Sequence, residues 1–178
     1  MPDLAAEALM AYWRPLLDHN LKNIMGLYAL VHEDVMKPVA QRVALVLLKD
    51  YPNAQEDNLE LLLHAALRYG DRRELSSYAY HILTHHTPLT DDNRSLWYAV
   101  AIALDHTSIT SGLADYVREK AEQAARILDF LCPSHDVKSD TLYPLSLIAL
   151  KSLIAVMAPL FHPRNLSVSG LMTIRGPE

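Results

Sequence analysis

The junction Gly70-Asp71 constrains the fold most, because it places a helix end and a helix start next to each other. Before it, the stretch Leu59–Leu67 has apolar residues three or four positions apart, as on one face of a helix. Gly70 is the residue type that most often ends a helix in the left-handed conformation. Asp71 with Glu74 three residues later is an N-terminal capping signature. Two helices joined by so short a turn fold back on each other, so the sequence predicts an antiparallel hairpin.

Caps and breakers of this kind recur along the 178 residues. Asn53 with Glu56 predicts another cap, and Pro15 predicts a kink or restart within the first helix. The chain has only 5 Gly and 10 Pro, and this low glycine content favours helices over a glycine-rich β architecture. We expect about eight helices, over residues 3–16, 20–31, 38–48, 53–67, 71–83, 92–104, 111–131 and 142–161.

The expected fold class is therefore all-α, built from antiparallel helical hairpins in one domain over residues 1–162. From Arg164 to Ile174 the pattern changes to alternation with β-branched residues. Residues 163–178 are accordingly predicted to form a non-helical tail.

Two expected helices are apolar on all sides. One contains the run Leu96–Ile102, and the other covers the segment Leu142–Phe161. The second is about twenty residues long, which is enough to cross a bilayer. Lys151 lies at its centre, where a charge costs roughly 2.5–3.5 kcal/mol on insertion scales. We therefore expect both segments to be buried helices at the centre of a water-exposed domain, and we regard a membrane partner as disfavoured.

The segment Ser111–Leu131 shows the clearest amphipathic periodicity in the chain. Its apolar positions recur every three or four residues, and charged residues occupy the opposite face. Glu122 and Arg126 are four residues apart there, which predicts an ion pair within one continuous helix.

Charge and cysteine content restrict the partners and the compartment. The formal net charge is −5, and the 16 basic residues do not cluster, so no nucleic-acid partner is expected. The single Cys132 cannot form an internal disulfide. The N-terminus lacks the basic region of a secretory signal. These features favour a cytoplasmic protein.

The one unusual inventory is nine histidines. His81 and His85 would lie one turn apart on a helix, the spacing at which two imidazoles share a metal ion such as zinc. His64 on the preceding helix is the candidate third ligand. The competing interpretation is structural, because a histidine at a helix C-terminus interacts favourably with the last carbonyls and the dipole.

No catalytic residue or cofactor-binding residue is predicted. The chain has no glycine-rich phosphate loop and no G-x-S-x-G elbow around a serine nucleophile. The sequence therefore favours a protein without enzymatic activity. A small metal-dependent enzyme or sensor built on the histidines is the alternative.

Four aromatic residues are candidate anchors for another protein, because Tyr and Trp dominate interface hot spots. They are Tyr12, Trp13, Tyr78 and Tyr80. For each of them, an ordinary position in the core or at its edge is the alternative.

Two segments resemble known helical repeats. Asp34–Leu48 resembles the second helix of a HEAT repeat, through a V-R-x-x-A-x-x-L-like pattern. Leu59–Pro88 resembles a tetratricopeptide unit, although Leu59, Leu63 and Ala66 stand where that family has Trp, Gly and Tyr. The resemblance implies a scaffold that binds another protein, or a second copy of itself, as one segment of a larger assembly. An irregular helix bundle without a superhelix is the alternative.

Overall fold

A computed structural model describes residues 2–85, 87–132 and 145–161, and every regular element within these ranges is a helix. The all-α class is thus confirmed, while the expected tail over residues 163–178 lies outside the described residues. The α-helices are α1 (Pro2–Asp18), α2 (Leu27–His32), α3 (Lys37–Asp50), α4 (Glu56–Tyr69), α5 (Arg72–Thr84), α6 (Asp91–Ala103), α7 (Thr110–Glu119), α8 (Glu122–Leu131) and α9 (Leu147–Met157). Two short 3-10 turns, η1 (Asp34–Met36) and η2 (Thr107–Ile109), precede α3 and α7.

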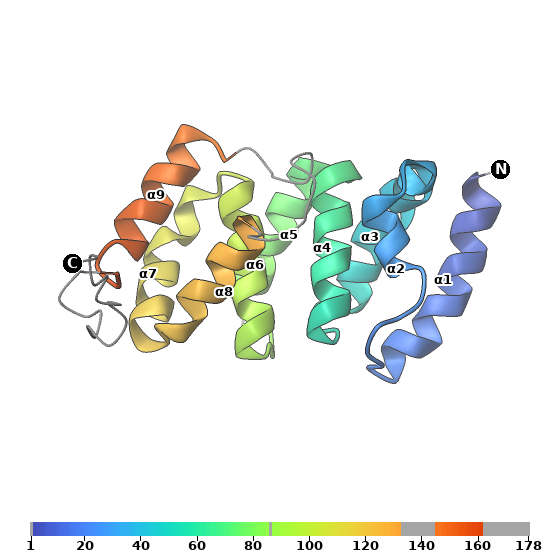
Figure 1. The fold of residues 1–178 in the computed structure, drawn as a ribbon, viewed down its shortest axis with the longest axis horizontal. Helices are drawn as coiled ribbons and strands as arrows, with labels where there is room; N and C mark the ends of the chain where they lie inside the picture. The colour runs from blue at the N-terminus through green and yellow to red at the C-terminus, as the bar shows by residue number, and fades with distance from the viewer. Residues whose placement is uncertain (1, 86, 133–144, 162–178) are drawn as a thin grey trace, which may run out of the picture.

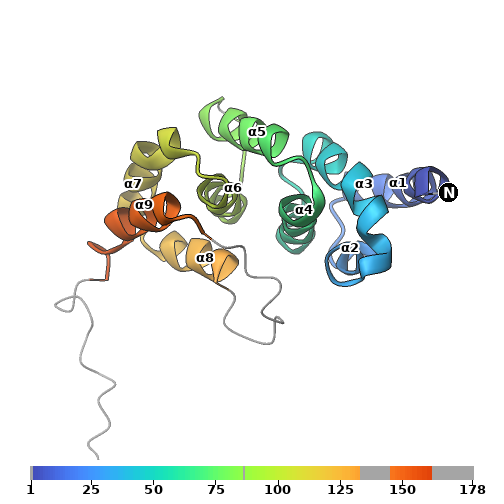
Figure 2. The ribbon, with the colours of Figure 1, turned by 90° about the horizontal axis from the view of Figure 1, so that it is seen from above.

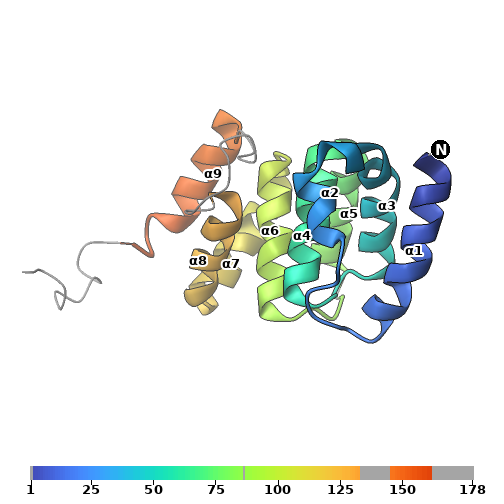
Figure 3. The same cartoon turned by 45° about the vertical axis from the view of Figure 1, so that its right-hand side comes forward.

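The helices are arranged in two rows. Seen from above, α1, α3, α5 and α7 follow one another in one row, and α2, α4, α6 and α8 form the other (Figure 2). Helices of neighbouring hairpins pack on each other: α1 on α3, α2 on α4, α4 on α6, and α6 on α8. The last helix, α9, packs on α7 and α6. As a result, α1 and α9 lie at opposite ends of an elongated array (Figures 1 and 3).

Helix α6 is the most enclosed element, with α4, α5, α8 and α9 packed against it. The apolar run Leu96–Ile102 is buried along its whole length, as predicted. The indole of Trp97 is fully buried, and its Nε1 donates a hydrogen bond of 2.9 Å to the carbonyl oxygen of Pro52. Burial of a large apolar side chain contributes about 1.5–3 kcal/mol, so this helix provides a large share of the core.

The start of α6 is also tied to the loop before α4. The buried Asn93 donates from Nδ2 to the side-chain oxygen of Asn53 at 2.8 Å and to the carbonyl of Ala54 at 2.8 Å. Asn53 therefore does not cap α4, and that prediction is wrong. The side chain of Gln55 caps α4 instead, by accepting from the backbone N–H of Asp57. A tertiary contact has taken over the side chain that the local pattern assigned to a cap.

The Gly70-Asp71 junction forms the expected hairpin between α4 and α5. The Asp71 side chain accepts hydrogen bonds from the backbone N–H groups of Arg73 and Glu74, each 2.9 Å, which confirms this cap. Gly70 is extended, with φ −81° and ψ 174°, so the predicted left-handed stop is wrong. Glycine is needed there for space, because a Cβ at this position would lie 2.6 Å from the carbonyl oxygen of Ala66.

Two expected helices are interrupted. The segment predicted over residues 20–31 is helical only from Leu27 to His32. The reason is Asn58 on α4, which is buried and bonds the backbone of both Leu21 and Ile24. These bonds hold residues 21–24 in a turn, while Asn20 has a positive φ of 49°.

The segment Ser111–Leu131 forms α7 and α8 rather than one helix, with the break at Lys120. The hydroxyl of Tyr116 on α7 donates 2.7 Å to the carbonyl of Asp91, and Lys120 forms an ion pair with the carboxylate of Asp91. Both helices bury their own apolar stripe. The break lets α7 and α8 each follow the surface of the array.

We predict that Gly70→Ala lowers the free energy of unfolding by about 1–3 kcal/mol, the usual cost of overpacking. The added methyl group would press on the Ala66 carbonyl, which is backbone and cannot turn aside as a flexible side chain can. Gly112→Ala is the matched control, because its methyl group would meet only the Tyr98 hydroxyl at 3.3 Å. Urea unfolding of both variants tests this, and an equal loss in the two would contradict it.

Candidate interaction surface

Helix α9 has an apolar side chain on nearly every face but is buried on only one of them. Ala149, Leu153, Val156 and Met157 pack towards the array. On the other side, Leu147 is 66% exposed and Ile154 is 56% exposed. The prediction of a central buried helix over Leu142–Phe161 is therefore wrong, because α9 lies at one end of the array (Figure 1).

The exposed side chains form a continuous surface. At 3.6 residues per turn they cover about half of the helix circumference. We call this surface the α9 face; it consists of Leu147, Ile148, Leu150, Lys151, Ile154, Ala155 and Ala158. Lys151 is its only charged residue. A helix of a globular protein normally presents polar residues to solvent, so an exposed apolar patch of this kind is a candidate interaction surface.

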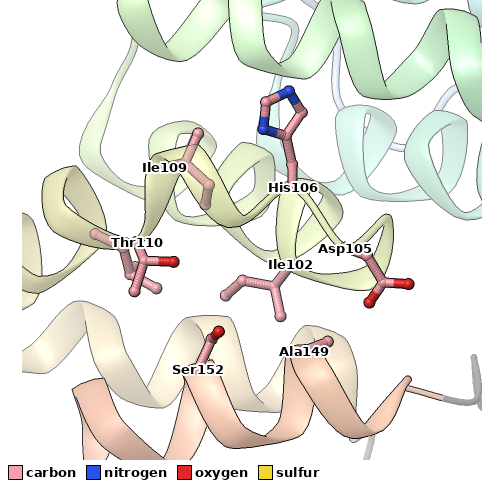
Figure 4. Close-up of a pocket in the computed structure, with 8 residues that line it drawn as sticks. Ile102, Asp105, His106, Ile109, Thr110, Ala149 and Ser152 are labelled. Atoms are coloured by element: carbon pink, nitrogen blue, oxygen red, sulfur yellow. The ribbon is translucent and has the colours of Figure 1, made fainter.

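Contacts at its N-terminus fix α9 against α6 and α7. The Ser146 hydroxyl caps the helix by accepting from the backbone N–H of Ala149 at 3.1 Å, and it donates to the carboxylate of Asp105 just after α6. Figure 4 shows Ala149 and Ser152 of α9 across a small hollow from Ile102 and Thr110. Apart from this hollow, the inward side of α9 thus packs on its own chain.

Helix α1 lies at the opposite end of the array (Figure 3), and it presents a second exposed apolar surface. Its residues recur every three or four positions, and Leu4 is 67% exposed. We call this surface the α1 face; it consists of Leu4, Ala5, Ala8, Ala11, Tyr12 and Pro15. Acidic Glu7 is exposed beside it. Three of these residues are alanines, so this face is shallower than the α9 face.

Of the four predicted aromatic anchors, only Tyr12 and Tyr80 are exposed. The prediction that Trp13 is an exposed anchor is wrong. Trp13 is a core residue, because it is 0% exposed and its Nε1 donates a hydrogen bond of 3.0 Å to the carbonyl of Met25. Tyr78 is half-buried with its hydroxyl 3.2 Å from the carbonyl of Lys49, and burial raises the pKa of that hydroxyl. Tyr80 lies parallel to the His106 ring at 4.7 Å.

The predicted three-histidine site is not assembled. His81 and His85 do lie together, with ring centroids 4.1 Å apart, and His85 Nδ1 is 3.1 Å from the carbonyl of His81. His64 lies elsewhere, stacked on Phe130 of α8 at 4.2 Å. Among the residues that the structure describes, no three His, Cys, Asp or Glu side chains are grouped so that they could hold a metal ion.

His64 belongs instead to an ionic cluster between α4 and α8. The Arg126 Nη2 donates 2.5 Å to Glu60, and Arg126 Nε lies 2.7 Å from Glu56, although that N–H is not aligned for a hydrogen bond. The Nε2 of His64 is 3.6 Å from the other oxygen of Glu60. The prediction that Arg126 pairs with Glu122 is therefore wrong, because Arg126 reaches two carboxylates on a different helix.

The partly buried Glu60 carboxyl has a strongly shifted pKa in this cluster. Burial by itself raises the pKa of the Glu60 carboxyl. Contacts with His64 and Arg126 lower this pKa by a larger amount, so the net pKa is about 2. Arg126 is the closer of the two at 2.5 Å. The cluster joins α4 to α8 on either side of α6, so we interpret it as a structural connection rather than a reactive site.

Helix α9 also bears on membrane association. Within the described part of the chain, no helix is both long and apolar enough to span a bilayer.

Comparisons with known proteins found no matching protein-family model, no matching curated protein and no matching solved structure.

The sequence shows that the helix Leu147–Met157 is apolar all round, but it does not show where in the fold this helix lies. An all-apolar helix with a lysine at its centre is compatible with a buried helix and with a half-exposed one. Only the position of α9 at the end of the array distinguishes them.

We predict that Glu60→Gln flattens the acid end of the stability profile. The pKa of Glu60 is about 2 in the folded protein and near its ordinary value of 4.5 when unfolded. The stabilisation from this carboxylate is present above the unfolded pKa and is lost as the pH falls towards the folded pKa. From about pH 5 to about pH 2, the wild type should lose about 1–3 kcal/mol more unfolding free energy than the variant.

Glu119→Gln is the matched control for this measurement. Glu119 is exposed on α7 and takes part in no ion pair with the described residues. This variant should follow the wild type in urea unfolding across the pH series. Parallel profiles for Glu60→Gln and the wild type would contradict the role of the cluster.

Proposed function

We propose that this protein is a non-enzymatic helical scaffold that mediates protein–protein interaction through the α9 face. The observation that carries the proposal is an exposed arc of helix surface in which Lys151 is the only charged residue. The inward side of the same helix packs on α6 and α7, and the described part of the chain leaves its outward side exposed.

The energy available from covering this surface is substantial. Leu147, Ile148, Leu150 and Ile154 are each between 42% and 66% exposed. Covering about half of a Leu or Ile side chain contributes roughly 1 kcal/mol, so the four together offer about 4 kcal/mol before the cost of association. This is sufficient for the apolar centre of a modest interface, to which a polar rim would add specificity.

The chemistry of the α9 face favours a protein over a lipid surface. Helices that lie on membranes combine an apolar face with a separate face rich in Lys and Arg. Helix α9 has one lysine, Lys151, and it lies within the apolar arc rather than opposite it. The partner expected from this pattern is an apolar helix with an acidic residue at its edge.

The two-row arrangement supports the same proposal. In arrays of stacked helical hairpins each unit contacts only its neighbours, and the end units must be capped by polar residues or covered by another protein. Neither α1 nor α9 has a polar outer face. The predicted resemblance to HEAT and tetratricopeptide scaffolds points in the same direction.

We predict that a photo-crosslinking amino acid at Ile154 forms a protein adduct in the cells from which the protein originates. The same amino acid at Ser77, exposed on α5, should form none, which makes it the control. Adding Leu147→Glu should reduce the Ile154 adduct at least about tenfold, since a buried unpaired charge costs more than 1.4 kcal/mol.

Mass spectrometry of the adduct distinguishes the outcomes. A polypeptide crosslinked at Ile154 supports the proposal when Leu147→Glu removes it. A lipid adduct, equal yields at Ile154 and Ser77, or a yield unaffected by Leu147→Glu would each contradict it.

A further inference from the structure

We infer that the α9 face binds the α1 face of a second copy of this chain, so that copies associate head to tail. This inference rests on the proposed function of the α9 face and specifies its partner. It depends on the shape, the charge and the placement of the two faces within one molecule.

The two faces are complementary in shape. The α9 face carries large aliphatic side chains, including Leu147 and Ile154, each more than half exposed. The α1 face carries Ala5, Ala8 and Ala11, whose small side chains leave room between the larger Leu4 and Tyr12. Helices pack when the ridges of one fit the grooves of the other, and large side chains opposite small ones allow close approach.

The two faces are also complementary in charge. Lys151 lies in the α9 face, and Glu7 lies at the edge of the α1 face. Neither forms an ion pair with any described residue, whereas the neighbouring Asp3 and Arg14 on α1 are already paired with Arg42 and Asp50. An intermolecular pair between Lys151 and Glu7 would satisfy two opposite charges that the single copy leaves exposed.

Charge argues against the simpler symmetric dimer in which two α9 faces meet. Lys151 lies close to the middle of the helix Leu147–Met157. A two-fold axis through the middle of this face would place the lysine of one copy beside the same lysine of the other. The resulting repulsion is absent when α9 meets α1.

The placement of the faces determines the kind of assembly. Because α1 and α9 lie at opposite ends of the array, one contact leaves a free face at each end of the pair (Figure 1). Such a contact is heterologous and adds copies in an open chain. The contact involves two helices of 17 and 11 residues, which is smaller than a standard interface, so we expect association that increases with concentration.

The test uses sedimentation velocity with two blocked variants of the full chain. Ala8→Glu with Ala11→Glu places charge in the α1 face, and Leu147→Glu with Ile154→Glu places charge in the α9 face. All four positions are exposed, so both variants should fold, which thermal unfolding by circular dichroism checks. Ser77→Glu on α5 is the control and should associate as the wild type does.

Each blocked variant alone should remain at the monomer mass of 20.0 kDa at all concentrations. An equimolar mixture of the two has one intact α9 face and one intact α1 face, so it should form a dimer and nothing larger. Dimerisation of the α1-blocked variant by itself would show that two α9 faces meet and would overturn the inference.

Charge reversal provides a second readout. Lys151→Glu and Glu7→Lys should each weaken association about threefold to tenfold, and the two in one chain should restore it. A wild type that stays monomeric throughout overturns the inference. If Ile154 then still crosslinks to a different protein, the proposed function stands and only the identity of the partner is wrong.

Discussion

The burial of α6 determines where the neighbouring hairpins lie. An unpaired buried polar group costs about 1–3 kcal/mol, so the polar side chains of this buried helix are most stable when they bond neighbouring segments. Asn93 bonds the loop before α4, and Trp97 bonds the carbonyl of Pro52. Ser95 lies 3.1 Å from the Tyr116 hydroxyl on α7. These contacts fix the positions of neighbouring hairpins relative to one core helix.

The same composition has a different consequence in α9. Both helices are apolar all round in sequence, and the sequence predicts both at the centre of the domain. α6 has neighbours in both rows, whereas α9 has α7 and α6 on one side and no helix beyond it among the described residues. Composition therefore predicted the helices and their apolar character, but the order of packing decides which of them presents an apolar face to a partner.

Local patterns succeeded where nothing more distant competed for the same side chain. Asp71 caps α5 as its spacing predicts, because both acceptor and donors lie within one turn. Asn53 and Arg126 had equally good local assignments, but each bonds a residue on another helix. Arg126 is 66 residues from Glu60, and no local pattern could identify that pair. Likewise, the antiparallel hairpin predicts His64 as a third ligand beside His81 and His85, but His64 stacks on Phe130 of α8 instead.

The most direct measurement is carbene footprinting of the α9 face in two conditions, the dilute purified protein and a concentrated native extract. We expect strong labelling of Leu147 and Ile154 in the dilute protein and protection of both in the extract. Val35 is 77% exposed on η1, outside both faces, so its labelling should be the same in both. Equal labelling of the α9 face in the two conditions would show that no partner covers it, and the proposed role of this face would be wrong.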